Sequence, residues 1–206
     1  MLTFLRRLFA SSGSTAPACE REQETPAPID WGELEDLLVR LAAGTVERFA
    51  AEHPVEVFYG LGFDCHADYG QVLVCLNTRE AQREAGDEDD DWAFGNWRYH
   101  GINLEDPAWE AWEEAPLVMS NAANVLLNNR KGHALPALYE AFLEMATRAL
   151  LRVAQSEAVG RLRKESGFQV LAMDHDEGPE AAVARMEHLR RTHVSRHAIN
   201  ENQGDS

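Results

Sequence analysis

The chain has 206 residues, 45% of them hydrophobic, and 35 acidic against 19 basic side chains give a formal net charge of −16. This length suits one domain of roughly 100–200 residues with loose ends. The charge excludes a typical nucleic-acid binder, because such proteins gather Lys and Arg against phosphates, and it disfavours binding to anionic lipid.

Residues 1–28 are expected to form a flexible leader and linker. Apolar side chains surround Arg6 and Arg7, and residues 11–28 are rich in Ser, Thr, Pro and Glu. A short amphipathic helix would bind a membrane surface only marginally, and a lipoprotein signal ending at Cys19 would need an apolar stretch before it. No apolar run approaches the ~18 residues of a spanning helix, so we expect no stable membrane insertion.

A single α+β domain is expected over residues 29–194, followed by a disordered tail over residues 195–206. Asp30 and Glu33 have the spacing of a helix N-cap and of the third helical residue. Apolar residues then recur at helical spacing until Pro54, which ends the predicted first helix.

A β-hairpin is predicted next. Residues 55–63 and 70–76 are β-prone, and residues 64–69 between them read as a turn. Gly60 and Gly62 leave one face of the first strand bare, so we expect another part of the chain to pack close to it.

The rest of the chain alternates between helical and extended patterns. Thr78 offers a cap for a short helix through Ala85, residues 92–100 are expected to form a third strand, and residues 168–173 a fourth. Further helices are predicted at residues 106–114, 116–129 and 135–153 and from Pro179 onwards. This order predicts an α+β fold with a small, mostly antiparallel sheet of about four strands covered by helices on one side.

Two groups of metal-binding side chains lie far apart in the sequence. The first is Asp64, His66 and Asp68, and the second is the Asp-His-Asp triplet at residues 174–176. A metal site needs three or more converging ligands, and nothing in the sequence brings the two groups together. Turn and cap formation by Asp explains both groups, so we expect no metal and no cofactor.

Enzyme motifs are absent from the sequence. His100 could act as a general base, but no partner nucleophile is visible, and His193 and His197 stand among arginines that would repel a cation. There is no G-x-S-x-G, Walker loop, dinucleotide fingerprint or H-E-x-x-H motif. Three cysteines without a C-x-x-C pair favour reduced thiols in a cytoplasm. We therefore expect a cytoplasmic protein that is not an enzyme.

The strongest anomaly is a run of five acids at residues 87–91. Twelve acids lie between Glu80 and Glu114, against only Arg83 and Arg98. One interpretation is a solvated loop and helix face. The other is a docking surface for a basic protein, with nearby tryptophans as anchors, although burial in the core explains tryptophans equally well. The predicted partner-binding residues are Asp87, Glu88, Asp89, Asp90, Asp91, Trp92, Trp97, Trp109 and Trp112.

Three strings resemble a known bacterial family. They are FYGLGF at residues 58–63, VLVCLNTRE at residues 72–80 and NWRYH at residues 96–100. Domains of the family DUF4303, a domain of unknown function, show an F-Y-x-x-G strand, a second strand ending in N-T-x-E and a later W-x-x-x-W-x-Y. The resemblance covers about residues 31–189.

This resemblance implies a role in protein binding. Such domains are similar to the small α+β immunity proteins of bacterial polymorphic-toxin systems, so we expect a protein that neutralises a cognate, basic toxin by direct occlusion through its acidic surface. The alternative is a small enzyme or a nucleotide- or ligand-binding domain that uses a cleft near Gly60, Gly62 and His100.

Overall fold

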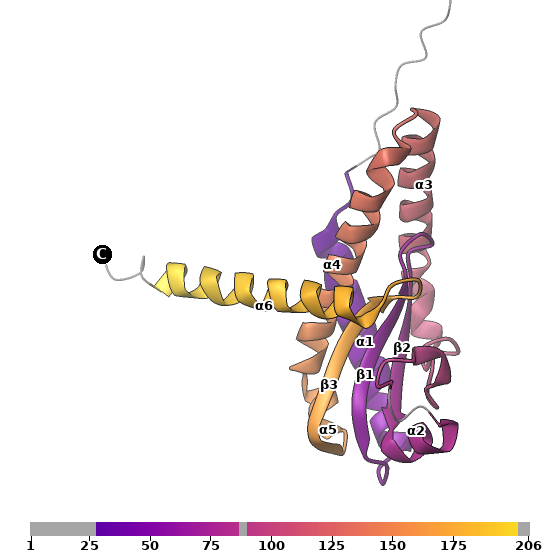
Figure 1. The fold of residues 1–206 in the computed structure, drawn as a ribbon, viewed down its shortest axis with the longest axis vertical. Coiled ribbons are helices and arrows are strands. Elements are labelled where there is room, and N and C mark those ends of the chain that lie inside the picture. Colours follow the sequence, from indigo (N-terminus) through magenta and orange to yellow (C-terminus); the bar gives the residue numbers. More distant parts are fainter. Residues whose placement is uncertain (1–27, 87–89, 202–206) are drawn as a thin grey trace, which may run out of the picture.

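A three-stranded sheet lies at the centre of the molecule (Figure 1). The computed structural model describes residues 28–86 and 90–201, with side chains as far as Thr192. Strands β1 (Phe58–His66), β2 (Gln71–Thr78) and β3 (Lys164–Asp174) take the order β2-β1-β3. The pair β1–β2 is antiparallel and the pair β1–β3 is parallel. The prediction of about four, mostly antiparallel strands is therefore wrong: the described residues form three strands in a mixed sheet.

The predicted hairpin is confirmed, but its first strand is longer at the C-terminal end than expected. β1 begins at Phe58 and continues to His66, and its register pairs His66 with Gln71 of β2. Asp64 and His66 therefore belong to the strand and not to the turn. Because side chains alternate along a strand, these two residues point to the same face of the sheet.

The predicted third strand at residues 92–100 is wrong. This segment contains the short 3-10 helix η1 (Phe94–Asn96), and it touches the sheet edge through one bridge, between Leu76 and Tyr99. A Cβ atom at Gly62 would lie 2.2 Å from Cε1 of Phe94. The segment thus packs its aromatic rings onto the face of β1 that Gly60 and Gly62 leave bare, and its backbone does not form a further strand. A close approach of another part of the chain to these glycines was predicted from the sequence.

Helices cover both faces of the sheet, rather than one (Figure 1). Leu61, Phe63 and Cys65 of β1 belong to the larger core cluster, which α1 (Trp31–Glu52) and α4 (Leu135–Ala154) complete. Residues on the opposite face, including Tyr59, Leu73 and Met173, pack with η1 and with α6 (Pro179–Glu201). The remaining helices are α2 (Arg79–Ala85), η2 (Pro107–Trp112), α3 (Glu114–Asn128), η3 (Gly132–Ala134) and α5 (Glu157–Arg161).

The caps predicted from the sequence are present. Oδ1 of Asp30 accepts hydrogen bonds from the backbone amides of Gly32 and Glu33, each at 3.0 Å, and Oγ1 of Thr78 accepts one from Ala81 at 3.1 Å. These bonds satisfy amides that a helix start leaves without a partner inside the helix. The predicted helix at residues 106–114 appears as the 3-10 helix η2, whose first turn Asp106 caps.

Candidate functional site

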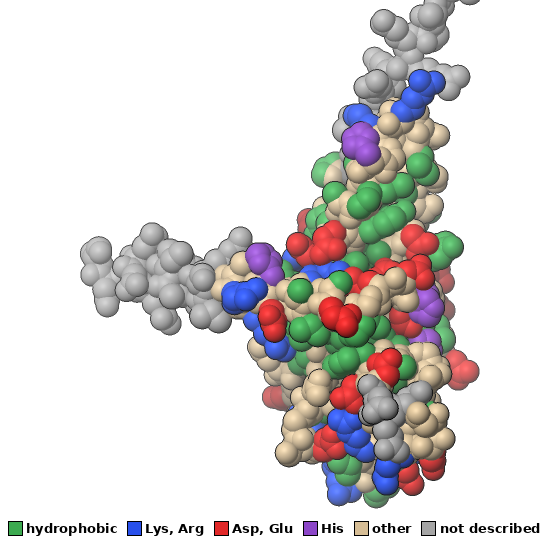
Figure 2. All heavy atoms as spheres, in the orientation of Figure 1, with side chains coloured by type: hydrophobic (Ala, Val, Ile, Leu, Met, Phe, Trp, Pro, Cys, Tyr) green, Lys and Arg blue, Asp and Glu red, His purple; other side chains and the backbone are tan. Residues whose placement is uncertain are grey.

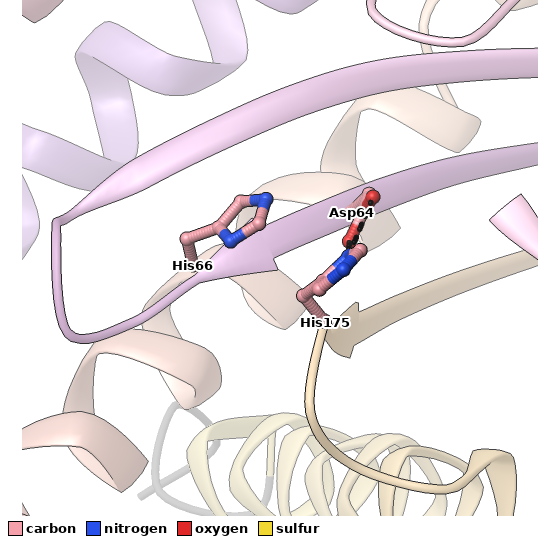
Figure 3. Close-up of side chains that lie close together, drawn as sticks. All are labelled: Asp64, His66 and His175. Carbon is pink, nitrogen blue, oxygen red and sulfur yellow. Dashed lines mark hydrogen bonds and ion pairs between the residues drawn. The ribbon is translucent and has the colours of Figure 1, made fainter. Parts of the chain in front are cut away.

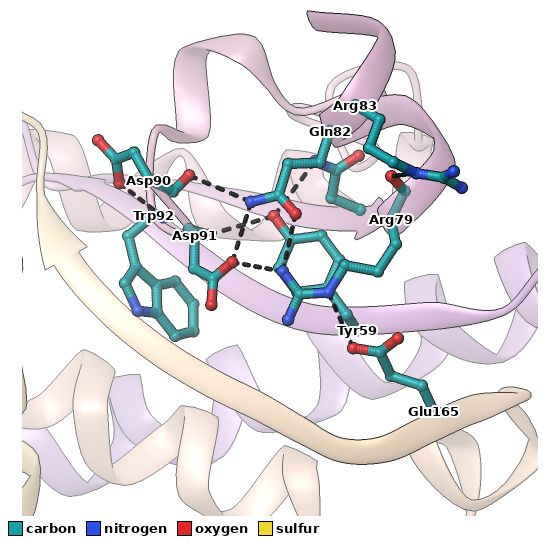
Figure 4. Close-up of polar contacts among 9 residues, drawn as sticks. Tyr59, Arg79, Gln82, Arg83, Asp90, Asp91, Trp92 and Glu165 are labelled. Atoms are coloured by element: carbon teal, nitrogen blue, oxygen red, sulfur yellow. Dashed lines mark hydrogen bonds and ion pairs between the residues drawn. The ribbon is translucent and has the colours of Figure 1, made fainter. Parts of the chain in front are cut away.

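Much of the described acidic run is tied into the fold. Asp87, Glu88 and Asp89 lie outside the described residues. Asp91 forms an ion pair with Arg79 and accepts a hydrogen bond from Nε2 of Gln82 at 2.9 Å (Figure 4). Arg79 also donates to Glu165 at 3.0 Å. Asp91 therefore links α2 to the loop before η1, and its charge is already paired within the fold.

Asp90 has a local structural role as well. Its Oδ1 accepts a hydrogen bond from the backbone amide of Trp92 at 2.9 Å. Burial alone would raise the pKa of Asp91, but the hydrogen bonds from Arg79 and Gln82 outweigh it and hold this pKa below its ordinary value. On the face shown in Figure 2, acidic and basic side chains intermingle around α2.

Three of the four predicted tryptophan anchors are buried. Trp97, Trp109 and Trp112 belong to the core, and only Trp92 is partly exposed. Nε1 of Trp109 donates to Oγ1 of Thr45 at 2.9 Å, and Nε1 of Trp112 donates to the backbone oxygen of Gly70 at 3.1 Å. These indoles serve packing and cannot anchor a partner without unfolding part of the core.

An acidic groove lies instead along η2. We call it the η2 acidic groove: a cavity of about 490 Å³ lined by twelve residues, among which are Glu105, Asp106, Glu110 and Glu113 but no Lys or Arg. Glu105, Glu110 and Glu113 are exposed and make no ion pair with another described residue. Asp106 pairs with Arg48, so its charge is partly neutralised.

A second candidate site forms where the two predicted groups of metal-binding residues meet. Asp64 and His66 share one face of β1, and the parallel register places Met173 of β3 beside Asp64. The chain continues past β3 so that the backbone amide of His175 donates to the carbonyl of Cys65 at 2.7 Å. His175 consequently lies next to both Asp64 and His66 (Figure 3).

Asp64 is the centre of this histidine–aspartate cluster, which comprises Asp64, His66, His100 and His175. Its side chain is 1% exposed, and its Oδ2 lies 2.8 Å from Nε2 of His100. Nδ1 of His175 lies 3.4 Å from each carboxylate oxygen, and the rings of His66 and His175 stack with centroids 4.6 Å apart. Burial alone would raise the pKa of Asp64, but the hydrogen bonds and charges of the two histidines outweigh it and lower this pKa. The carboxylate is therefore ionised.

The other residues of the two groups behave as turn formers, as predicted. Oδ2 of Asp174 accepts from the amide of Ala67 at 3.0 Å, and its Oδ1 accepts from the amide of Asp176 at 3.1 Å. Asp68 is exposed. The side chains of His193 and His197 lie outside the described residues.

The cleft expected near Gly60 and Gly62 is filled by aromatic rings. A Cβ atom at Gly60 would lie 3.0 Å from Cη2 of Trp97, and Phe94 covers Gly62. A depression of about 270 Å³ lies beside this packing, and Asp64, His175 and Trp92 are among its lining residues. One sequence signal for the histidine–aspartate cluster exists. Asp64 and His66 are two residues apart, so they share a face if both belong to a strand, but the sequence pattern predicted a turn there.

These features define a small α+β domain with a mixed sheet, an acidic groove and a buried carboxylate surrounded by histidines. The chain belongs to the family described as Domain of unknown function (DUF4303), whose model matches residues 38–192. This match confirms the family expected from the strand motifs. Neither the curated proteins nor the solved structures contain a match to the chain. In the part of the chain that the structure describes, no helix has the length and apolar character needed to cross a membrane.

Proposed function

We propose that the chain is a protein-binding domain of the immunity type, which neutralises a cognate bacterial toxin in the cytoplasm by occluding it directly. The observation that carries this proposal is the η2 acidic groove, in which Glu105, Glu110 and Glu113 make no ion pair with another described residue and no Lys or Arg belongs to the lining. Such a concentration of one charge attracts a partner of the opposite charge and repels nucleic acid. The partner is therefore a basic protein.

Apolar contact is available at the same place. Leu104 lines the groove and is 63% exposed, and Pro107 lies beside it on the exposed surface. Charge raises the association rate, while apolar side chains buried at the centre of an interface supply most of the affinity. Leu104 takes the role of anchor that the buried tryptophans cannot take.

The test compares two charge-neutralising variants. Glu105→Gln, Glu110→Gln and Glu113→Gln together remove three unpaired charges from the groove. The matched control removes three exposed charges elsewhere through Glu157→Gln, Glu180→Gln and Glu187→Gln. Association with the toxin domain encoded beside this gene is measured by surface plasmon resonance at low and high salt.

We expect the groove variant to associate at least about ten-fold more slowly than wild type at low salt, with the difference shrinking as salt screens the charges. The control should associate as wild type does. Equal rates for both variants would show that the groove is not the binding surface. Absence of a toxin gene beside this one, or failure of the chain to protect cells that express that toxin, would contradict the immunity role itself.

A small enzyme or ligand-binding domain is the second candidate function. The specific observation in its favour is the histidine–aspartate cluster, where buried Asp64 orients the partly exposed ring of His100. An imidazole held by a carboxylate in this way is suited to accept a proton. A ligand would enter the depression beside Trp92, because the glycine face of β1 is filled.

A further inference from the structure

Three ligating side chains converge from separate parts of the sequence. Asp64 and His66 are two residues apart on β1 and share a face, and His175 follows β3 beside them. One potential ligand atom from each residue lies within 4.8 Å of the others. The hydrogen-bonded sheet fixes the backbone of all three positions, so the convergence does not depend on a loose loop.

The distances suit a transition metal. Two ligands bound at about 2.0–2.2 Å in a tetrahedral site are separated by roughly 3.3–3.6 Å. Nδ1 of His175 lies 3.4 Å from each oxygen of Asp64. The ring of His66 is partly exposed and has one nitrogen within 4.8 Å of the ligand atoms of Asp64 and His175. Because an imidazole binds a metal in its ring plane, coordination by both histidines requires the ring of His66 to rotate out of its stack on His175.

A second observation points to a missing cation. Oδ1 of Asp64 is buried and accepts no hydrogen bond from any described residue. A buried carboxylate oxygen that accepts no hydrogen bond is costly, because a nitrogen 3.4 Å away does not replace the hydrogen bonds to water that the oxygen has lost. His100 holds the other oxygen at 2.8 Å and so fixes the orientation in which Oδ1 faces His175. Such outer hydrogen bonds typically orient the ligands of metal sites.

We propose that Asp64, His66 and His175 bind one divalent transition-metal ion, with Zn²⁺ as the best-matched species. Two imidazoles and one carboxylate form a nitrogen and oxygen donor set that suits zinc, whereas Mg²⁺ and Ca²⁺ require oxygen ligands throughout. His100 is a positioning residue for the carboxylate. This site is independent of the η2 acidic groove and of the immunity role.

Three protein ligands leave a coordination position open to solvent. The depression of about 270 Å³ beside Asp64 and His175 is lined further by Trp92, Asn96 and Glu177. Closed structural zinc sites use four protein ligands, while sites that act on water or on a bound ligand keep one position open. The site therefore belongs to the second kind. We expected no metal because the two groups lie far apart in the sequence. The parallel pairing of β1 and β3 brings them together in space.

The test uses the full chain, stripped with a chelator and then dialysed, and titrated with ZnCl₂ by isothermal calorimetry. A tightly bound equivalent of zinc is expected. His66→Gln and His175→Gln should each weaken its binding at least about ten-fold, as loss of a ligand does. His66→Gln is the decisive variant, because the described contacts of that ring are limited to stacking and the fold should survive its replacement. His188→Gln, an exposed histidine on α6, is the matched control and should bind as wild type does.

Co²⁺ substitution provides a readout of the site itself. Tetrahedral Co²⁺ with nitrogen and oxygen ligands gives a visible absorption band that should disappear in His66→Gln while circular dichroism stays unchanged. MgCl₂ should produce no calorimetric signal. The proposal is overturned if micromolar zinc binds at less than about 0.2 equivalents, or if His66→Gln and His175→Gln both bind zinc as tightly as wild type.

Discussion

The sequence predicts that Asp91 binds a partner and that Asp106 begins an acidic helix, but in the structure both carboxylates are bound within the fold. Asp91 serves Arg79 and Gln82, and Oδ2 of Asp106 accepts from Oγ1 of Thr45 at 2.8 Å. A carboxylate that satisfies several donors contributes to stability, whereas one surrounded by water contributes little. An acid that already accepts hydrogen bonds inside the fold is therefore not available to a binding partner, whereas an exposed acid without an ion pair is.

Replacing Asp91 by Ala should lower the free energy of unfolding by about 1–2 kcal/mol, because Arg79 and Gln82 lose a charged acceptor in a partly buried place. Glu80→Ala is the control: Glu80 is exposed and makes no ion pair with a described residue, so its removal should change stability by less than about 0.5 kcal/mol. Urea denaturation of the three proteins measures both effects. Equal stability of the two variants would show that the Arg79–Asp91 pair does not support the fold.

At the scale of elements, the segment from Trp92 to Trp97 is shaped by the glycines that it covers. Phe94 and Trp97 meet edge to face, with ring centroids 4.8 Å apart, and both rings lie against β1. Glycine at positions 60 and 62 is what allows these rings to approach the sheet backbone. The aromatic residues of this segment thus form the second core cluster instead of a strand.

Gly62→Ala should destabilise the protein by about 1–3 kcal/mol, since the new methyl group would overlap the buried ring of Phe94. The matched control is Gly160→Ala in α5, where an added Cβ atom meets nothing within 4 Å. Alanine is the better helix former there, so the control should leave stability unchanged or raise it by up to about 1 kcal/mol. Thermal melts followed by circular dichroism compare the two. A Gly62→Ala protein as stable as wild type would contradict the packing described for Phe94.

At the scale of the whole molecule, one buried arginine connects α6 to the rest of the fold. The side chain of Arg185 is 6% exposed and donates to Glu177, in the turn after β3, and to Glu140 of α4. Burial alone would lower the pKa of Arg185, but the hydrogen bonds and charges of the two glutamates outweigh it and raise this pKa. Arg185 therefore keeps its positive charge in this buried place.

Arg185→Met keeps the apolar stem of the side chain and removes its charge. We expect a loss of about 3 kcal/mol in the free energy of unfolding, because Glu177 remains largely buried without its cation. The control Arg161→Met breaks an exposed pair with Glu47 and should cost less than about 1 kcal/mol. Denaturant unfolding monitors both variants. If both variants lost the same free energy of unfolding, the buried ion pairs of Arg185 would contribute no more to stability than an exposed pair does.

Local features were determined by the sequence alone. The caps at Asp30 and Thr78, the helix now seen as α4, the β1–β2 hairpin and the family motifs depend on residues a few positions apart. Caps and helical periodicity are set by neighbours along the chain, so they can be read without knowing the fold. The family expected from those short strings is confirmed by a family-model match over residues 38–192.

Only the tertiary structure decided how distant segments meet. The parallel pairing of β3 with β1 depends on how the intervening helices pack, and periodicity shows which face of an element is apolar but not what covers it. That pairing placed His175 beside Asp64 and His66, and the packing on Gly62 made residues 92–100 a covering segment instead of a strand. Burial of Trp109 and Trp112 likewise holds η2 against the core, with Glu110 and Glu113 exposed in the η2 acidic groove. Contacts between distant segments therefore determined both candidate sites: the β1–β3 pairing for the histidine–aspartate cluster and the packing of η2 for the η2 acidic groove.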